Sequence, residues 1–350
     1  MPNSRLPPAV DGRLISLPGD GPGLCAYASP AALTERADLE MAVDTPLLLI
    51  HSVNASACAA EVRPLFERYG SRRPTLALEL PGFGTSQRGP LAYSPSMMVQ
   101  SVLRAVHHLR NIGFTQPIDV LALSLSCEFV ALAALEQPSW FRSVALVSPT
   151  GLESGRDEPY AQGKTKENAL LRRFLVSPLG EPAFRMLTTP SSMRWFLERA
   201  WGSPVIDEEL LEYEHLTARR PGARYAPAAF ISGALFTEGI ATQYAKLAPA
   251  VWLAHGVRGE FTDFGGLLRI GPPKNWSWET FGTGAMPQLE VPRLFMSRYD
   301  SFLERVAVKA VAVSAKPAAV QVRADDAYDF SATRNGRRRW SPAAAASASR

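Results

Sequence analysis

The chain alternates between short, mostly apolar runs and longer segments with helical spacing. Strands that are apolar throughout are typical of a parallel sheet covered by helices on both faces. The first two runs are close together and predict a hairpin. The six runs are RLISL (13–17), LCAYA (24–28), PLLLI (46–50), TLALEL (75–80), IDVLAL (118–123) and SVALVS (143–148).

Helical patterns separate these predicted strands. They cover residues 59–69, 94–113 and 127–137, each between one apolar run and the next. Strands that alternate with helices form crossover units, in which consecutive strands run parallel. We therefore expect an α/β fold with a mostly parallel sheet flanked by helices.

The pattern changes after Leu152. Residues 153–247 contain several helical segments and no convincing strand, whereas strands return at 250–255 and 276–281, followed by an amphipathic helix. A helical insertion before the last two strands predicts a lid over the carboxyl ends of the strands, where such sheets bind ligands. The predicted parts are the first part of the core (1–152), the lid (153–247), the second part of the core (248–310) and a disordered tail (311–350).

The positive charge of the chain lies in the predicted tail. From residue 313 onward seven Lys or Arg face three Asp, and this segment alone accounts for the formal net charge of +4. Its Ala- and Ser-rich composition cannot bury enough apolar surface to fold, so it is either a solvated tail or a tether to an anionic surface. The remaining chain carries no net positive charge, which argues against a nucleic-acid partner.

Other compositional features exclude several classes of protein. The three cysteines are widely spaced, and we find neither metal-ligand spacing nor a phosphate-binding glycine loop, so we expect no metal and no cofactor. No apolar run is long enough for a membrane span, and the beginning, MPNSRLPPAVDG, lacks the apolar core of a secretory signal. A reduced, cytoplasmic setting fits best.

Ser124 stands at the junction of a predicted strand and a predicted helix, in VLALSLSCEFVALAAL (120–135). A serine in such a strained turn projects its hydroxyl from the sheet, provided that the residues two before and two after it are small. Ala122 and Ser126 meet this requirement. For Ser126 as the nucleophile, the second flanking residue would be Glu128, which is too large.

Four motifs in sequence order resemble those of the α/β-hydrolase fold superfamily over roughly residues 40–305. They are LLLIHSVNAS, ALELPGFGTS, ALSLSCEFVA and GAMPQLEVPRLF. The resemblance implies that Ser124 is a nucleophile and that the backbone N–H groups of Val53 and Leu125 form an oxyanion hole. Asn54 and Ser56, which follow the oxyanion loop, either bind substrate or cap the loop.

The chain departs from the family pattern at the catalytic base. The motif that normally carries the histidine reads GAMPQLEVP (284–292), and Ala285 occupies the histidine position. Pro287, Glu290 and Pro292 match the pattern on the far side of this position, so the alignment is secure. A serine hydroxyl needs a base to take its proton, and the usual base is missing.

The catalytic acid is displaced as well. Gly259 occupies the position at which the family has its acid, within the loop GVRGEFTD. Glu260 and Asp263 are the candidate acids, if the loop is long enough to bring one of them to the site. The alternative is that both are solvated loop carboxylates.

Three histidines are candidates for a substitute base. His51 ends the strand expected next to the strand before Ser124, His255 ends a strand two places away, and His215 lies in the predicted lid. A lid residue can complete a site when the lid closes. For each of the three, the alternative is a structural role.

Two functions are compatible with these residues. The first is an enzyme that acts on an ester, thioester or related carbonyl of a small apolar substrate, with Ser124 as nucleophile and a degenerate triad. The second is an inactive homologue that binds a small apolar ligand or a protein partner. The loss of the histidine at Ala285 favours the second, whereas the intact turn at Ser124 favours the first.

Overall fold

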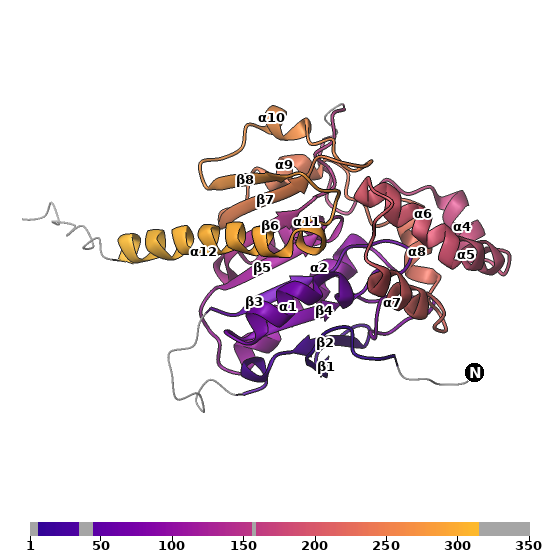
Figure 1. Ribbon diagram of the computed structural model, residues 1–350, viewed down its shortest axis with the longest axis horizontal. Coiled ribbons are helices and arrows are strands. Elements are labelled where there is room, and N and C mark those ends of the chain that lie inside the picture. The colour runs from indigo at the N-terminus through magenta and orange to yellow at the C-terminus, as the bar shows by residue number, and fades with distance from the viewer. Residues whose placement is uncertain (1–5, 35–44, 156–158, 315–350) are drawn as a thin grey trace, which may run out of the picture. The chain divides into compact units, whose positions relative to one another are not determined.

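The computed structural model describes residues 6–34, 45–155 and 159–314 of the 350-residue chain. Its centre is an eight-stranded sheet in the order β1-β2-β4-β3-β5-β6-β7-β8 (Figure 1). β1 and β2 form the predicted antiparallel hairpin, and all strands from β4 to β8 along this order run parallel. The strands are β1 (Arg13–Leu17), β2 (Leu24–Ala28), β3 (Leu47–Ile50), β4 (Thr75–Glu79), β5 (Ile118–Leu123), β6 (Phe141–Val147), β7 (Ala250–Gly256) and β8 (Trp276–Phe281).

Helices cover both faces of the sheet because successive side chains of a strand point to opposite faces. On one face, Leu48 and Ile50 of β3 pack in an apolar core with two helices, and on the other face Leu47 and Leu49 pack in a second core with two more. The first two helices are α2 (Pro95–Asn111) and α3 (Ser126–Glu136), and the other two are α1 (Arg63–Gly70) and α12 (Pro292–Ser314), with the short α11 (Pro287–Glu290) beside α1.

The segment between β6 and β7 is helical, as predicted. Apart from an isolated bridge between Thr165 and Thr237, its described residues form no strand. In Figure 1 most of these helices lie to the right of the sheet. They are α4 (Ala169–Val176), α5 (Gly180–Leu187), α6 (Pro190–Trp201), α7 (Glu208–Ala218), α8 (Tyr225–Ile231) and α9 (Ile240–Tyr244); α10 (Gly266–Ile270) follows β7.

The ends of several elements differ from the predicted ones. A 3₁₀ turn, η3 (Ala59–Val62), precedes α1, and two further turns are η1 (Pro30–Ala32) and η4 (Pro138–Trp140). α12 continues to Ser314, so it includes the first residues of the predicted tail; the rest of that tail lies outside the described residues. Among the described helices, none combines the length and the apolar character that crossing a membrane requires.

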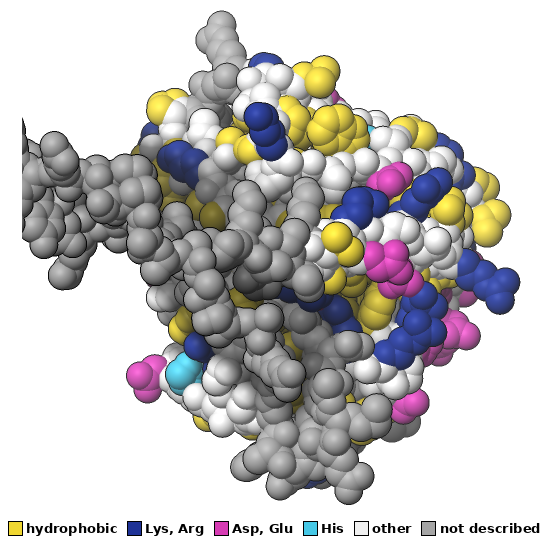
Figure 2. Space-filling view, turned by 90° about the vertical axis from the view of Figure 1, so that its left-hand side faces the viewer, with side chains coloured by type: hydrophobic (Ala, Val, Ile, Leu, Met, Phe, Trp, Pro, Cys, Tyr) yellow, Lys and Arg dark blue, Asp and Glu magenta, His cyan; other side chains and the backbone are white. Residues whose placement is uncertain are grey.

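Charged side chains of both signs lie on the face shown in Figure 2. On its described part, Lys and Arg lie among Asp, Glu and apolar side chains. A nucleic-acid-binding surface is expected to carry a continuous positive stripe. The mixed charges on the described part of this face form no such stripe.

Candidate active site

Ser124 lies at the turn between β5 and α3, in the centre of the sheet. Its φ of 52° is in the left-handed region, which a residue with a β-carbon rarely adopts. Its N–H donates to the Val147 carbonyl at 2.8 Å, and its carbonyl accepts from the Cys127 N–H at 3.0 Å. The side chain is half-buried, and its hydroxyl forms no hydrogen bond with any described residue. The turn therefore has the elbow geometry that the sequence predicts, with the hydroxyl available for a ligand.

The two predicted oxyanion donors are buried and unpaired. Val53 is 2% exposed and Leu125 is fully buried, yet neither backbone N–H donates to a residue that the structure describes. Two N–H groups without a partner in the described chain, one in the loop after β3 and one in the turn after Ser124, are compatible with the predicted oxyanion hole.

His51 supports the backbone beside the elbow. Its Nδ1 lies 2.5 Å from the Ser52 carbonyl, to which it donates, and its Nε2 accepts from the Leu80 N–H at 3.1 Å. Burial lowers the pKa of His51 to about 4. Both ring nitrogens are thus occupied, and the imidazole is neutral at physiological pH, so His51 in this conformation is not available to take a proton from Ser124.

His215 and His255 also have structural contacts. Nδ1 of His215 donates to the Thr188 carbonyl at 3.0 Å and joins α7 to the end of α5. His255 bonds the Gly256 carbonyl at 2.9 Å, and its ring packs on Phe264 with 4.2 Å between centroids. Within the described chain, no hydrogen bond joins either histidine to Ser124.

The candidate acids bond to other partners. Glu260 pairs with Arg199 on α6, and nearly half of each side chain is exposed. Asp263 accepts hydrogen bonds from the N–H and hydroxyl of Ser154, which lower the pKa of its carboxyl group. Within the described chain, neither acid forms a hydrogen bond or an ion pair with His51, His215 or His255.

The two loops that would carry the acid and the base lie under the end of α6. The Ala285 N–H donates to the Ala200 carbonyl at 2.9 Å, and the Glu260 N–H donates to the Arg199 carbonyl at 3.2 Å. A β-carbon at Gly259, which has a φ of +83°, would lie 2.5 Å from the Arg199 carbonyl oxygen. A side chain such as aspartate at this position is therefore incompatible with the seated helix.

Four buried glutamates were missed by the sequence reasoning, namely Glu61, Glu79, Glu128 and Glu214. Burial is the largest cause that raises the pKa of each of them. One signal was present: Glu214 shares the inward-facing side of α7 with buried Leu210 and Leu211. Among the described residues, no group of three or more His, Cys, Asp or Glu is arranged to hold a metal ion.

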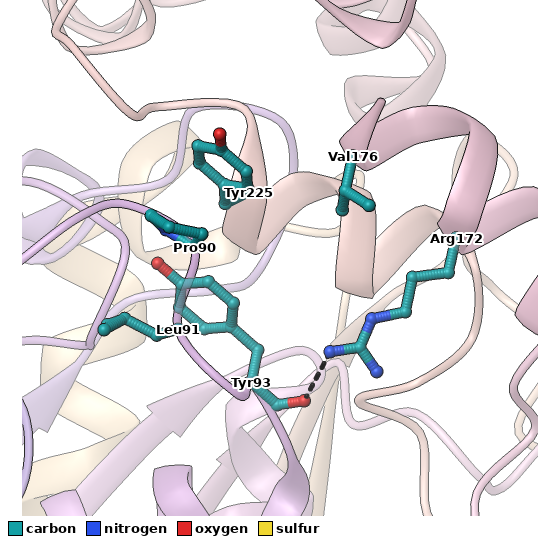
Figure 3. Close-up of a pocket in the computed structure, with 6 residues that line it drawn as sticks. All are labelled: Pro90, Leu91, Tyr93, Arg172, Val176 and Tyr225. Atoms are coloured by element: carbon teal, nitrogen blue, oxygen red, sulfur yellow. Dashed lines mark hydrogen bonds between the residues drawn. The ribbon is translucent and has the colours of Figure 1, made fainter. Parts of the chain in front are cut away.

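A hollow of about 320 Å³ lies beside α4 and α8 rather than at the elbow (Figure 3). Arg172 of α4 reaches across it and donates to the Tyr93 carbonyl at 3.3 Å. Ser124, Val53 and Leu125 are not part of its lining, so the hollow does not mark a substrate site at the serine. It is lined by Pro90, Leu91, Tyr93, Arg172, Val176 and Tyr225.

A largely parallel sheet, a left-handed serine between β5 and α3 and a helical insertion after β6 together define the α/β-hydrolase fold. This chain has that fold. The resemblance drawn from its four motifs is confirmed at this level.

Comparisons with known proteins agree on the fold. No protein-family model matches the chain, and no curated protein matches its sequence. Solved structures do match. A serine hydrolase involved in carbazole degradation is 12% identical with a TM-score of 0.62, over 84% of this chain and 99% of that one.

Two further structures have similar values. A membrane phospholipase A is 20% identical with a TM-score of 0.62, over 85% of this chain and 88% of that one. The 2-hydroxy-6-oxo-6-phenylhexa-2,4-dienoate hydrolase from Rhodococcus sp. strain RHA1 is 18% identical with a TM-score of 0.61, over 84% and 99%. At such identities the likeness establishes the fold, and activity has to be argued from the site.

Proposed function

We propose that the chain acts on an ester, thioester or related carbonyl of a small apolar substrate, with Ser124 as the nucleophile and without a histidine base. The observation that carries the proposal is the left-handed conformation of Ser124, whose hydroxyl is unpaired within the described chain. A strained backbone persists only where the surrounding structure holds it, and such strain concentrates at functional sites. The unpaired N–H groups of Val53 and Leu125 add independent support.

The chemistry follows from these groups. The Ser124 oxygen attacks the carbonyl carbon, the carbonyl electrons move to oxygen, and the oxyanion accepts hydrogen bonds from the two N–H groups. The hydroxyl proton passes to water or to the leaving oxygen or sulfur as its bond to carbon breaks. Water then hydrolyses the acyl-serine to the acid and restores Ser124. Without a base, such a site retains about 10³-fold catalysis over water, so turnover is expected to be slow.

An inactive, ligand-binding homologue is the second candidate. The observation in its favour is the seating of α6 on the loops that would carry the acid and the base, with Gly259 and Ala285 at those two positions. In this case Ser124 contacts a small apolar ligand or a partner without forming a covalent bond. The homologue would then keep the fold and the lid without turnover.

A fluorophosphonate probe separates the two candidates, because it forms a bond with a reactive serine oxygen whatever the natural substrate is. We expect time-dependent labelling of the wild type, loss of labelling in Ser124→Ala, and retention in Ser148→Ala. Ser148 is the matched control, since its φ of 46° is also left-handed while its hydroxyl donates to the Ala285 carbonyl at 2.7 Å. A wild type that stays unlabelled over hours at neutral pH would contradict the enzymatic proposal and support the binding homologue.

A further inference from the structure

A buried polar cluster joins the oxyanion loop, residues 51–56, to the lid. Two glutamates form its centre: Glu61 of η3 is fully buried, and Glu214 of α7 is 2% exposed. Both carboxyl groups bond to the same short loop, Glu61 to Ser52 and Asn54 and Glu214 to Ser56, and α7 packs on η3, so the two glutamates belong to one buried cluster. Two buried carboxylates repel each other unless something neutralises one of them.

Glu61 fixes the first half of the loop. Its Oε2 accepts from the Ser52 N–H at 2.7 Å, and its Oε1 accepts from the Ser52 hydroxyl at 2.9 Å and from the Asn54 amide at 3.3 Å. The carboxyl group thereby takes up the N–H of Ser52 and leaves that of the next residue, Val53, unpaired. The orientation of the oxyanion donor thus depends on Glu61.

Glu214 and its helix hold the second half. Glu214 Oε2 accepts from the Ser56 hydroxyl at 3.1 Å, and the Thr217 hydroxyl of the same helix donates to the Ser56 carbonyl at 2.9 Å. The other oxygen, Glu214 Oε1, is buried without a hydrogen-bond donor among the described residues. A proton shared with Glu61 would give this oxygen its missing partner.

The surroundings favour a proton over a cation. Burial, reinforced at Glu61 by the charge of Glu214, raises the pKa of Glu61 well above its usual range, and burial raises that of Glu214 to about 7. No Lys or Arg of the described chain forms an ion pair with either carboxylate. The titratable groups that act on the pair are Cys58, which precedes η3, and Asp207, the N-cap of α7. Glu79 on β4 acts on Cys58, and it lies near His51, Arg88 and Arg220, whereas Arg63 on α1 pairs with Glu209 on α7.

We propose that Glu61 and Glu214 share one proton and thereby position the oxyanion loop against lid helix α7, with Glu61 acting on Val53 through Ser52. Both are positioning residues, because they reach the site through the loop. Loss of the shared proton places two charges in one buried site and loosens the loop and α7 together. The assignment of the loop as an oxyanion hole rests on the proposed function, whereas the proton-dependent order of the loop does not.

Amide hydrogen exchange of residues 51–56, corrected for its intrinsic pH dependence, tests the pair without using Ser124. In the wild type we expect about tenfold weaker protection at pH 8 than at pH 6, since Glu214, whose pKa burial raises to about 7, ionises between these values. Glu214→Gln keeps a permanent donor toward Glu61, so its loop should be protected equally at both pH values. Glu61→Leu should lose protection of the loop at both pH values. If Glu61→Leu does not fold, Glu61→Gln takes its place in the same measurement.

Glu128→Gln is the matched control. Glu128 is buried with a pKa of about 7, but it accepts from Thr150 and Thr237 and forms no hydrogen bond with the loop. It should leave the pH dependence of loop exchange as in the wild type. The shared proton would be contradicted if loop exchange lost its pH dependence in Glu128→Gln, or if it kept that dependence in Glu214→Gln. Absent fluorophosphonate labelling together with pH-dependent loop exchange would defeat the proposed function alone.

Discussion

At the scale of single residues, the proposed nucleophile lies on a left-handed turn, whereas Ala285 occupies the predicted position of the base. The N–H groups of Val53 and Leu125, the predicted oxyanion donors, bond to no described residue. The described candidates for a base are held by other contacts, most firmly His51, whose two ring nitrogens are both hydrogen-bonded. The rate at which Ser124 reacts should therefore depend on whether position 285 supplies a base.

Restoring a base at this position should accelerate the reaction of Ser124. Ala285 is half-buried, and its carbonyl is held by Ser148 at the end of β6, close in the sheet to the elbow strand. We expect Ala285→His to raise the rate of fluorophosphonate labelling at pH 7 by about 10²-fold, the lower end of what a positioned base contributes, because no acid orients it. The gain should fall below about pH 6, as an imidazole becomes protonated.

Ala285→Gln controls for size without adding a base and should label at the wild-type rate. The double variant Ser124→Ala with Ala285→His should not label. An equal acceleration in both substitutions at 285 would show that the loop has merely moved, and that Ser124 does not use a base supplied from this position.

At the scale of elements, the sequence predicted the sheet well and the cap only in outline. The central strands are apolar at most positions because both of their faces are covered, so runs such as LLLI in β3 and IDVLAL in β5 identify them. Between β6 and β7 the sequence predicted several helical segments, and α4, α6 and α7 are among the helices found there. Helix ends such as the 3₁₀ turn before α1 depend on local packing that periodicity does not record.

The buried contacts of the site escaped prediction for a different reason. Glu61 and Glu214 belong to elements that are distant along the chain, and only the place of Glu214 on the apolar side of α7 indicates burial. Their burial exists only once α7 has packed on η3, which is a tertiary event. Tertiary contacts of this kind override the solvated surface position that a glutamate usually takes.

The seating of α6 on the loops after β7 and β8 can be tested at Gly259. We expect Gly259→Ala to lower the free energy of unfolding by about 1–3 kcal/mol more than Gly271→Ala, measured by urea denaturation. Both glycines are left-handed, with φ of +83° and +58°, so the backbone strain is shared. The new β-carbon at Gly259 meets the Arg199 carbonyl, whereas nothing lies within 4 Å of one at Gly271.

Equal destabilisation by the two substitutions would mean that α6 does not rest on the Gly259 loop in solution. A larger effect at Gly259 would support the seated helix. It would also explain why this position no longer carries an acid, since an aspartate there would have to displace α6.

At the scale of the whole molecule, the buried glutamates make stability depend on pH. Burial raises the pKa of Glu79, Glu128 and Glu214 to about 7 each, and it raises the pKa of Glu61 well above its usual range, whereas an unfolded glutamate titrates near 4.5. Between these values the folded state binds more protons than the unfolded state, so the free energy of unfolding falls as pH rises and stays lower above the folded pKa. His51 opposes this trend only below its unfolded pKa of about 6.5, because its folded pKa is about 4.

The window from pH 6.5 to 8 therefore isolates the carboxyl groups. We expect the free energy of unfolding, measured by urea denaturation at constant ionic strength, to be lower at pH 8 than at pH 6.5 by at least about 1 kcal/mol. Glu128→Gln and Glu214→Gln should each reduce this difference, because each removes one of the groups that must ionise inside the protein. A stability that is constant or rises across this window would show that the carboxyl groups are solvated, and that neither the loop nor the lid is closed over them.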